Sequence, residues 1–287
     1  MHIDTVPAGS AWTGDPHKLR DVGDKLIGLG TCDIKGAAAC ILAALGEVKP
    51  QNVAVLFSGD EEMGSEVMPY VIKNTDIKFI PKAIVCEPTS CTMGVRHRGM
   101  LAFNARFEGP GGHSSLADIT QAPLQRIIRF ANALSDYGDS FKDIGDAAYK
   151  GLCLNIGRIS TDGHMNVIPT EATLDFSLRP PPGDDVTRHS AAVYEIWNKG
   201  FKDGVLSQRV MQPALNKGNL TELSIIFAGY DPIDLPYWTE AAQLGAAGIN
   251  VVVFGPGHVD QAHKPDEFVK VNELIAATEL YSRALIA

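Results

Sequence analysis

The segment AIVCEPTSCTMGVRHRGMLAFNARFE, residues 83–108, contains the change of pattern that decides the fold. It begins with a continuous apolar run, Ala83–Cys86, which predicts a parallel strand covered on both faces. It ends with Leu101–Phe107, where apolar and polar residues alternate, which predicts a strand with one face in water. The chain therefore changes from α/β to α+β character at about Met93.

The sequence upstream of this change is typical of an α/β domain. Val53–Phe57 is a second short apolar run that ends near acidic residues, which predicts another parallel strand. Ile34–Val48 is rich in alanine and leucine, and Asp33 stands where a helix N-cap belongs. We therefore expect a buried helix there.

Downstream, strands are predicted over residues 152–159 and 172–178, and helices over 121–135 and 184–198. The α/β character then returns, with a helix over 239–247, a buried strand over 250–254 and a closing amphipathic helix over 271–286. The sequence thus predicts an α/β domain in two parts, residues 1–92 and 208–287. An α+β module with one half-exposed antiparallel sheet is inserted between them, over residues 93–207.

The composition is that of an ordinary globular protein, with 287 residues, 45% hydrophobic and 21% charged. The net charge of -9 leaves no large basic face, so we expect no nucleic-acid partner. No apolar run reaches the roughly 18 residues that cross a bilayer, and no signal-peptide pattern is present. We therefore expect a cytoplasmic protein with no membrane partner. The five cysteines contain no C-x-x-C pair, which argues against a disulfide framework.

Acidic residues and histidines gather where the apolar strands stop. They are His2, Asp4, Asp33, Asp60, Glu61, Glu62, Glu87 and His263. Ligands bind an open α/β sheet beyond the carboxyl ends of its strands, so these side chains could meet at one edge. The acids would repel one another unless a cation lay among them, and carboxylate with imidazole suits zinc. Two metals bridged by one carboxylate would use the whole set.

Each residue alone has a simpler interpretation. His2 could be a frayed terminus, Asp33 a helix N-cap, Glu61 with Glu62 a solvated turn, Glu87 the end of a strand and His263 a surface residue. The recurrence of acids directly after buried strands favours a shared site. Spacing alone leaves the two interpretations about equally open.

Motifs along the whole chain carry a resemblance to a known family. They are HIDTVP at residues 2–7, GLGTCDIKG at 28–36, DEE at 60–62, EPT at 87–89, GHSS at 112–115, GPG at 255–257 and QAH at 261–263. Together they resemble the metal-dependent amidohydrolases that include acetylornithine deacetylase, succinyl-diaminopimelate desuccinylase and aminoacylase. WTEA at 238–241 and AHKPDEF at 262–268 are most similar to the acetylornithine and acetylcitrulline deacetylase branch.

The resemblance implies a zinc-peptidase-like catalytic domain with a mixed, mainly parallel sheet, and an inserted lid and dimerisation domain. It implies that His2, Asp33 and Glu87 hold one zinc, and that Asp33, Glu62 and His263 hold the other, with cobalt as a possible substitute. Asp4 would orient His2. Glu61 would be the general base, taking a proton from water and giving it to the leaving amine. If Glu87 faces the metal, Cys86 should face away.

In the lid, the resemblance implies that His113 reaches the active site of the partner subunit in a homodimer and stabilises the oxyanion. Asn166 and Arg179 match positions that hold the substrate's carboxylate, for which a guanidinium is well suited. The simpler interpretations are a loop histidine and a solvent-facing strand arginine.

The expected reaction is hydrolysis of the N-acetyl amide of a small amino acid, as in arginine biosynthesis. The favoured substrate is N-acetylornithine, which would give ornithine and acetate, ahead of N-acetylcitrulline. N-succinyl-diaminopimelate is the nearest rival substrate.

Two other classes of protein are alternatives. Gly28-Leu29-Gly30 before a helix could indicate nucleotide binding, but Asp33 stands at the third glycine of G-x-G-x-x-G and would repel a pyrophosphate. A catalytically silent metal-binding or interaction protein on the same fold is the other, and the presence of every expected residue argues against it. The chain begins at the first motif, so the N-terminal part of the catalytic domain is expected to be missing. We expect a weakly held His2 and an open sheet edge as a result.

Overall fold

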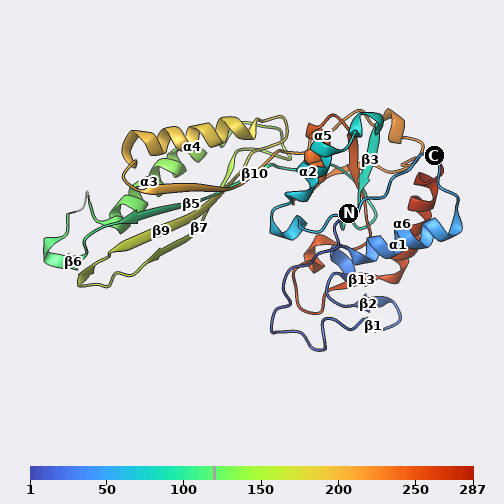
Figure 1. Cartoon of the computed structure of the whole chain (residues 1–287), viewed down its shortest axis with the longest axis horizontal. Coiled ribbons are helices and arrows are strands. Elements are labelled where there is room, and N and C mark those ends of the chain that lie inside the picture. Colours follow the sequence, from blue (N-terminus) through green and yellow to red (C-terminus); the bar gives the residue numbers. More distant parts are fainter. Residues whose placement is uncertain (119–120) are drawn as a thin grey trace. The chain divides into compact units, whose positions relative to one another are not determined.

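The computed structural model describes residues 1–118 and 121–287, with the backbone alone for Lys78, and divides into two compact units (Figure 1). Unit 1 contains Met1–Arg96 and Leu215–Ala287, and unit 2 contains His97–Ala214. Unit 2 begins and ends later than the predicted module. The reason is that residues 93–96 pair within the sheet of unit 1 and residues 205–212 within the sheet of unit 2.

The central sheet of unit 1 has four strands in the order β11, β4, β12, β3. They are β3 (Lys82–Val85), β4 (Met93–Arg96), β11 (Pro232–Asp234) and β12 (Asn250–Val253). β3 pairs with β12, and β4 with β11, in parallel, whereas β4 and β12 are antiparallel. The predicted mixed, mainly parallel sheet is confirmed.

Both faces of this sheet are covered, which explains the continuous apolar runs in its strands. On one face Val252 packs into a core with α1 (Gly36–Glu47) and α6 (Val271–Ala284). On the other face Val251 and Val253 share a core with α5 (Ala241–Ala246), which contacts α2 (Val67–Asn74). A small sheet of β1 (Arg20–Asp21), β2 (Lys25–Ile27) and β13 (Phe268–Lys270) completes the unit and was not predicted.

Two predictions for unit 1 are wrong. Residues 53–57 form no strand: in the described part of the chain the nearest pairing is a single β-bridge between His2 and Ser58, the residue after this segment. Helix α1 begins at Gly36 instead of Ile34, and Asp33 does not cap it. The carboxylate of Asp33 lies against two histidines instead.

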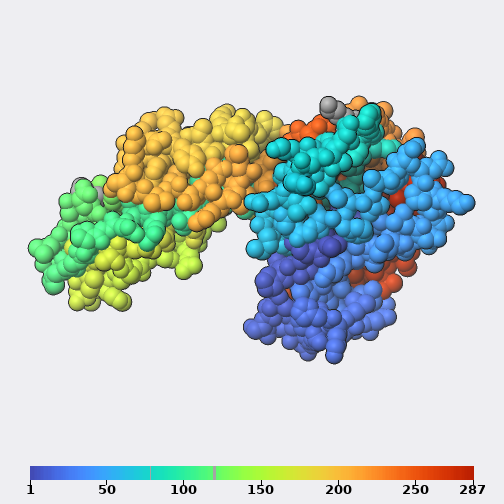
Figure 2. Space-filling model, in the orientation of Figure 1, coloured from blue at the N-terminus to red at the C-terminus, as the bar shows by residue number. Residues whose placement is uncertain are grey.

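The first residues of the chain, dark blue in Figure 2, pack against the lighter blue segment that follows residue 50. The amino group of Met1 donates to the carbonyl of Leu56 (3.2 Å), and Ser58 N–H donates to the carbonyl of Met1 (2.9 Å). His2 is buried, with 1% of its surface exposed. The interpretation of His2 as a frayed terminus is therefore wrong.

Unit 2 is a four-stranded antiparallel sheet in the order β10, β5, β9, β7 with two helices. Its strands are β5 (Met100–Glu108), β7 (Cys153–Thr161), β9 (Glu171–Arg179) and β10 (Val205–Gln212), and its helices are α3 (Pro123–Asp139) and α4 (Val186–Gly200). The predicted alternation holds, since Leu101, Phe103, Ala105 and Phe107 are buried. The rings of Phe103 and Phe107 belong to an aromatic core. In this core Phe103 stacks on Phe176 (5.2 Å between centroids) and Phe130 meets Trp197 edge-on (5.0 Å).

β6 (Gly112–His113) and β8 (Val167–Ile168), which are far apart in the sequence, form a separate two-stranded antiparallel sheet in unit 2. None of the helices in residues 1–118 and 121–287 combines the length and apolar character needed to cross a membrane.

Candidate metal centre and active site

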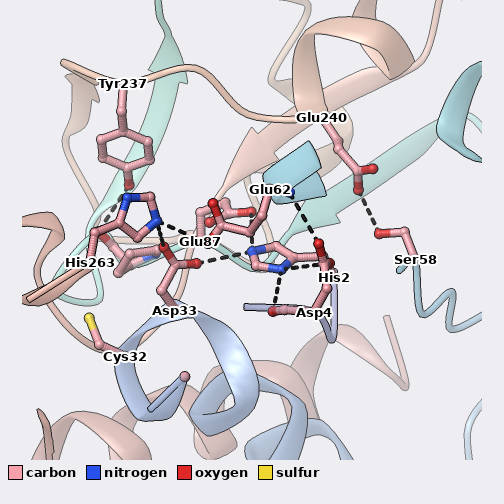
Figure 3. Close-up of polar contacts among 12 residues, drawn as sticks. His2, Asp4, Cys32, Asp33, Ser58, Glu62, Glu87, Tyr237, Glu240 and His263 are labelled. Carbon is pink, nitrogen blue, oxygen red and sulfur yellow. Dashed lines mark hydrogen bonds and ion pairs between the residues drawn. The ribbon is translucent and has the colours of Figure 1, made fainter. Parts of the chain in front are cut away.

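Six acidic and histidine side chains of unit 1 converge from five separate segments (Figure 3). His2 comes from the N-terminal segment, Asp33 from the turn that precedes α1, and Glu87 from the end of β3. Glu61 and Glu62 open a short 3-10 helix, Glu61–Met63, and His263 follows another, Val259–Gln261. These six side chains meet, as expected, but of the six only Glu87 closely follows a strand of the central sheet.

Asp33 lies between the two histidines. Its Oδ1 is 3.0 Å from His2 Nε2, which lies 3.7 Å from Glu87 Oε1. Its Oδ2 is 3.3 Å from His263 Nε2, which lies 2.9 Å from Glu62 Oε1. One carboxylate thus links two clusters, each with one imidazole and two carboxylates.

In both clusters one donor atom from each residue lies within 4.8 Å of the other two, so each set could hold a metal ion. Imidazole nitrogen with carboxylate oxygen is a donor set that suits zinc and cobalt. A third set, His2 with Glu61 and Glu62, meets the same distance limit. The structure therefore fits a two-metal centre and leaves Glu61 close enough to be either base or ligand.

Asp4 contacts the other side of the His2 ring. His2 Nδ1 lies 3.3 Å from Asp4 Oδ1 and 3.2 Å from the backbone carbonyl of Asp4. The second oxygen, Asp4 Oδ2, accepts a hydrogen bond from Glu62 N–H (3.2 Å). Asp4 therefore connects the segment of His2 to that of Glu62, which is the contact that an orienting residue makes.

The crowding of acids shifts the pKa values of the cluster. Burial lowers the pKa of His2, but its hydrogen bond to Asp33 and the charges of Glu87 and Glu61 outweigh this and raise it to about 10. Burial acts to raise the pKa of Asp33, whereas hydrogen bonds from His2 and His263 bring it to about 2. Hydrogen bonds to Asp33 and Glu62 raise the pKa of His263 to about 10.

The pKa values of Glu61 and Glu87 are raised, unlike that of the third carboxylate, Asp33. Burial is the main cause that raises the pKa of Glu61 to about 8, with the charges of Glu62 and Asp33 adding to the shift. Burial also raises the pKa of Glu87. Metal binding requires neutral imidazoles and ionised carboxylates, so at these raised pKa values it should release protons.

Cys86 and Glu87 face opposite ways, as predicted. The Cys86 thiol packs into the core with α1 and α6, while the Glu87 carboxylate faces His2.

Three further polar residues at the site were not singled out from the sequence. Tyr237 O–H donates to the carbonyl of Pro88 (2.9 Å), and Glu240 accepts from Ser58 Oγ (2.8 Å) and Ser65 Oγ (2.7 Å). Glu267 is the third.

The Glu267 carboxylate accepts hydrogen bonds from the backbone N–H groups of Gly30, Cys32 and Asp33. These are the N–H groups that a nucleotide phosphate would need at this glycine-rich turn. Because a side chain of the same chain already fills the turn, the nucleotide-binding interpretation is wrong.

The predicted lid residues all lie in unit 2. His113 is exposed on β6, and its Nδ1 accepts from Ser115 N–H (3.2 Å). Asn166 is exposed beside it, and its backbone carbonyl accepts from Ser114 N–H (3.1 Å). Arg179 is at the far end of β9, half-buried, and burial lowers its pKa.

Within unit 2, therefore, His113 and Asn166 lie together but Arg179 does not. β8 of the β6–β8 pair leads into the Glu171 end of β9. The nine residues of β9 put Arg179 about 26 Å from Glu171 along the strand. One chain cannot bring Asn166 and Arg179 to the same substrate carboxylate.

Comparison with known proteins is consistent with this geometry. The family described as Peptidase family M20/M25/M40 matches residues 1–287. The chain is 34% identical to N-acetyl-L-citrulline deacetylase of Xanthomonas campestris pv. campestris, over 99% of this chain and 80% of that protein. It is 28% identical to acetylornithine deacetylase of Myxococcus xanthus, over 99% and 78%.

Among solved structures, the fold is similar to an M20 family metallo-carboxypeptidase, Sso-CP2 from Sulfolobus solfataricus. The TM-score is 0.79 at 18% identity, over 99% of this chain and 83% of that chain. Human carnosine dipeptidase 1 is also similar, with a TM-score of 0.70 at 19% identity, over 98% and 78%. On the evidence of its full-length match, its relatives and its cluster of metal-binding side chains, the chain belongs to peptidase family M20/M25/M40, a family of metal-dependent amidohydrolases and peptidases.

Proposed function

We propose that this protein hydrolyses the N-acetyl amide of a small amino acid with two zinc ions. The observation that carries the proposal is Asp33, which offers one carboxylate oxygen to the cluster of His2 and the other to the cluster of His263. In this proposal His2, Asp33 and Glu87 hold one ion, and Asp33, Glu62 and His263 hold the other. When bound, the ions would lower the pKa of the attacking water and polarise the acetyl carbonyl.

Glu61 is the proton carrier of the proposed mechanism. Its carboxylate lies beside His2 and Glu62, at the edge of both clusters. It takes a proton from the attacking water and then gives it to the leaving amine, so that the amide bond breaks to yield acetate and a free amino group. Asp4 keeps the His2 ring in position throughout.

The substrate's other groups are assigned to unit 2. Arg179 binds the α-carboxylate through its guanidinium. His113 stabilises the oxyanion and Asn166 assists in binding, both from the partner subunit of a homodimer. Within one chain, Arg179 lies far from the β6–β8 strand pair that carries His113. This separation supports the assignment of Arg179 and His113 to different subunits.

Two substrates fit the proposal. N-acetylornithine is favoured by the similarity to acetylornithine deacetylases, at 28 to 30% identity. N-acetylcitrulline is favoured by the 34% identity to an N-acetyl-L-citrulline deacetylase. The two differ in the charge of the side chain, which is cationic in ornithine and neutral in citrulline.

The test is to remove metal with a chelator, restore zinc or cobalt, and measure turnover of N-acetylornithine, N-acetylcitrulline and N-succinyl-diaminopimelate by one preparation. We expect activity to disappear with the metal and to return with it, on one of the two acetylated substrates. Full activity in metal-free protein would refute the mechanism. Turnover of the succinylated substrate alone would refute the assigned acyl group.

A further inference from the structure

Glu267 is a buried carboxylate that binds the backbone of the segment carrying Asp33. Its Oε1 accepts hydrogen bonds from the N–H groups of Cys32 (2.8 Å) and Asp33 (2.9 Å). Its Oε2 accepts from Gly30 N–H (2.8 Å). Only 2% of Glu267 is exposed. The carboxylate therefore determines the path of the backbone from Gly30 to Asp33.

The three N–H groups converge because of the backbone conformation at Gly30, whose φ of 80° is left-handed. A β-carbon there would lie 2.8 Å from the methyl group of Thr5, so the turn requires glycine. Successive N–H groups in such a turn form a concave anion-binding site. Here the anion is the side chain of Glu267.

Glu267 is itself fixed from the other side. Its backbone carbonyl accepts from Gly28 N–H (3.0 Å), and β13, which follows it, pairs with β2. The preceding residue, Asp266, accepts from Arg20 (2.6 Å) and from Thr13 Oγ1 (2.9 Å). The segment that contains His263 is thus anchored at the residues that directly follow it.

We propose that Glu267 is a positioning residue that holds Asp33 and His263 in metal-binding geometry before metal binds. The inference rests on the proposed function, because it takes both residues as zinc ligands. Both oxygens of Glu267 are engaged by backbone N–H groups, so it acts through Asp33 and not on the substrate. These three hydrogen bonds join residues that are 234 to 237 positions apart in the sequence.

Glutamine cannot replace Glu267 in this role. Its amide NH2 group would face a backbone N–H, and two donors cannot bond each other. At least one N–H would lose its acceptor in a buried place, and the charge that strengthens the other bonds would be lost. The backbone from Gly30 to Asp33 would therefore be held by fewer and weaker hydrogen bonds.

The first test measures zinc affinity by calorimetric titration of metal-free Glu267→Gln and of the metal-free parent. Circular dichroism confirms that the variant is folded. We expect the zinc affinity to fall about 10- to 100-fold, the usual effect of losing a residue that supports a metal ligand. Glu273→Gln is the matched control, since Glu273 also accepts a backbone N–H, but from Gly257 (2.8 Å), which lies outside the Gly30–Asp33 turn that Glu267 binds. Its zinc affinity should stay within about threefold of the parent.

An unchanged zinc affinity in folded Glu267→Gln would overturn the proposal, as would an equal loss in Glu273→Gln. A residue with only a structural role would lower the melting temperature of metal-free protein and leave the affinity of the folded molecules unchanged.

The second test needs no variant, so it holds even if Glu267→Gln does not fold. Hydrogen exchange is measured at the amides of Gly30, Cys32 and Asp33 in metal-free parent protein. We expect them to be protected before zinc is added, because Glu267 already binds them. Exchange at the rate of exposed amides until zinc is added would show that the metal organises the turn, and would refute the proposal. Neither test uses turnover, so a failure of the proposed deacetylase activity would be seen separately.

Discussion

Glu61 and Glu62 show, at the residue scale, how two adjacent carboxylates can take different parts. They lie in a 3-10 turn, where neighbouring side chains point in different directions. Glu62 lies 2.9 Å from His263, while Glu61 lies beside His2 and is sufficiently buried that its pKa rises to about 8. A carboxylate that lies beside both clusters and is not needed in either of the two sets that share Asp33 is placed for proton transfer.

Substituting Glu61→Gln keeps the volume of the side chain and removes the base. We expect kcat to fall by roughly two to four orders of magnitude, while zinc content stays at the parental value. Steady-state kinetics and metal analysis of the same sample measure both. Glu66→Gln, an exposed carboxylate in the same loop, is the control and should behave as the parent does. If Glu61→Gln loses metal, Glu61 is a ligand and the third cluster is the correct one.

The convergence of these residues could be predicted from the sequence because each follows an apolar run or lies in a recognisable motif. The roles of Glu240 and Glu267 could not be predicted in this way. Their partners are serine hydroxyls and backbone N–H groups far away in the sequence, and every residue except proline has such a backbone group. A pattern of residue types therefore carries no record of these bonds, although both acids lie in motifs of the resemblance.

At the scale of elements, strands could be predicted where buried and exposed residues alternate. They could not be predicted where strand formation depends on pairing with a neighbouring strand. β5 and β9 were predicted from their alternation, since one face of each packs on α3 and α4. Val53–Phe57 has the composition of a strand but joins no sheet in the described part of the chain. The Met1 amino group bonds to the carbonyl of Leu56, and Val53, Leu56 and Phe57 are exposed. β10 was missed because its burial follows no strict alternation around the register shift between Gln208 and Val210.

The length of β9 decides what Arg179 can do. Because β9 separates Arg179 from the β6–β8 strand pair, the arginine would bind a carboxylate without help from Asn166 of its own chain. We expect Arg179→Ala to raise KM for acetylated amino acids by on the order of ten- to hundredfold, since a charged bidentate contact is worth about 1.5–3 kcal/mol. The α-carboxamide of the same substrate should be affected little. An equal loss on both substrates would refute the assignment, and Arg158→Ala, on exposed β7, is the control.

At the scale of the whole molecule, the proposed reaction needs residues from both units. The metal-binding clusters lie in unit 1, whereas His113 and Asn166 lie exposed at the β6–β8 strand pair of unit 2. Most soluble oligomers are twofold symmetric, so in a homodimer two such strand pairs could serve two sites.

Subunit exchange between two inactive variants tests whether His113 acts in the partner's site. His113→Ala retains Glu61, and Glu61→Gln retains His113, so a mixed dimer has one site with both residues if the histidine acts across the interface. Half of the dimers in a fully exchanged equal mixture are mixed and have one complete site of two, so we expect about one quarter of parental activity. Each variant carried alone through the same exchange should stay inactive, and mixed dimers are counted by differently tagged chains. If mixed dimers form and activity does not return, His113 acts within its own chain or has no part in the reaction. Mixing the variants under conditions that keep dimers intact should give no recovery, because the complete site arises only when chains exchange.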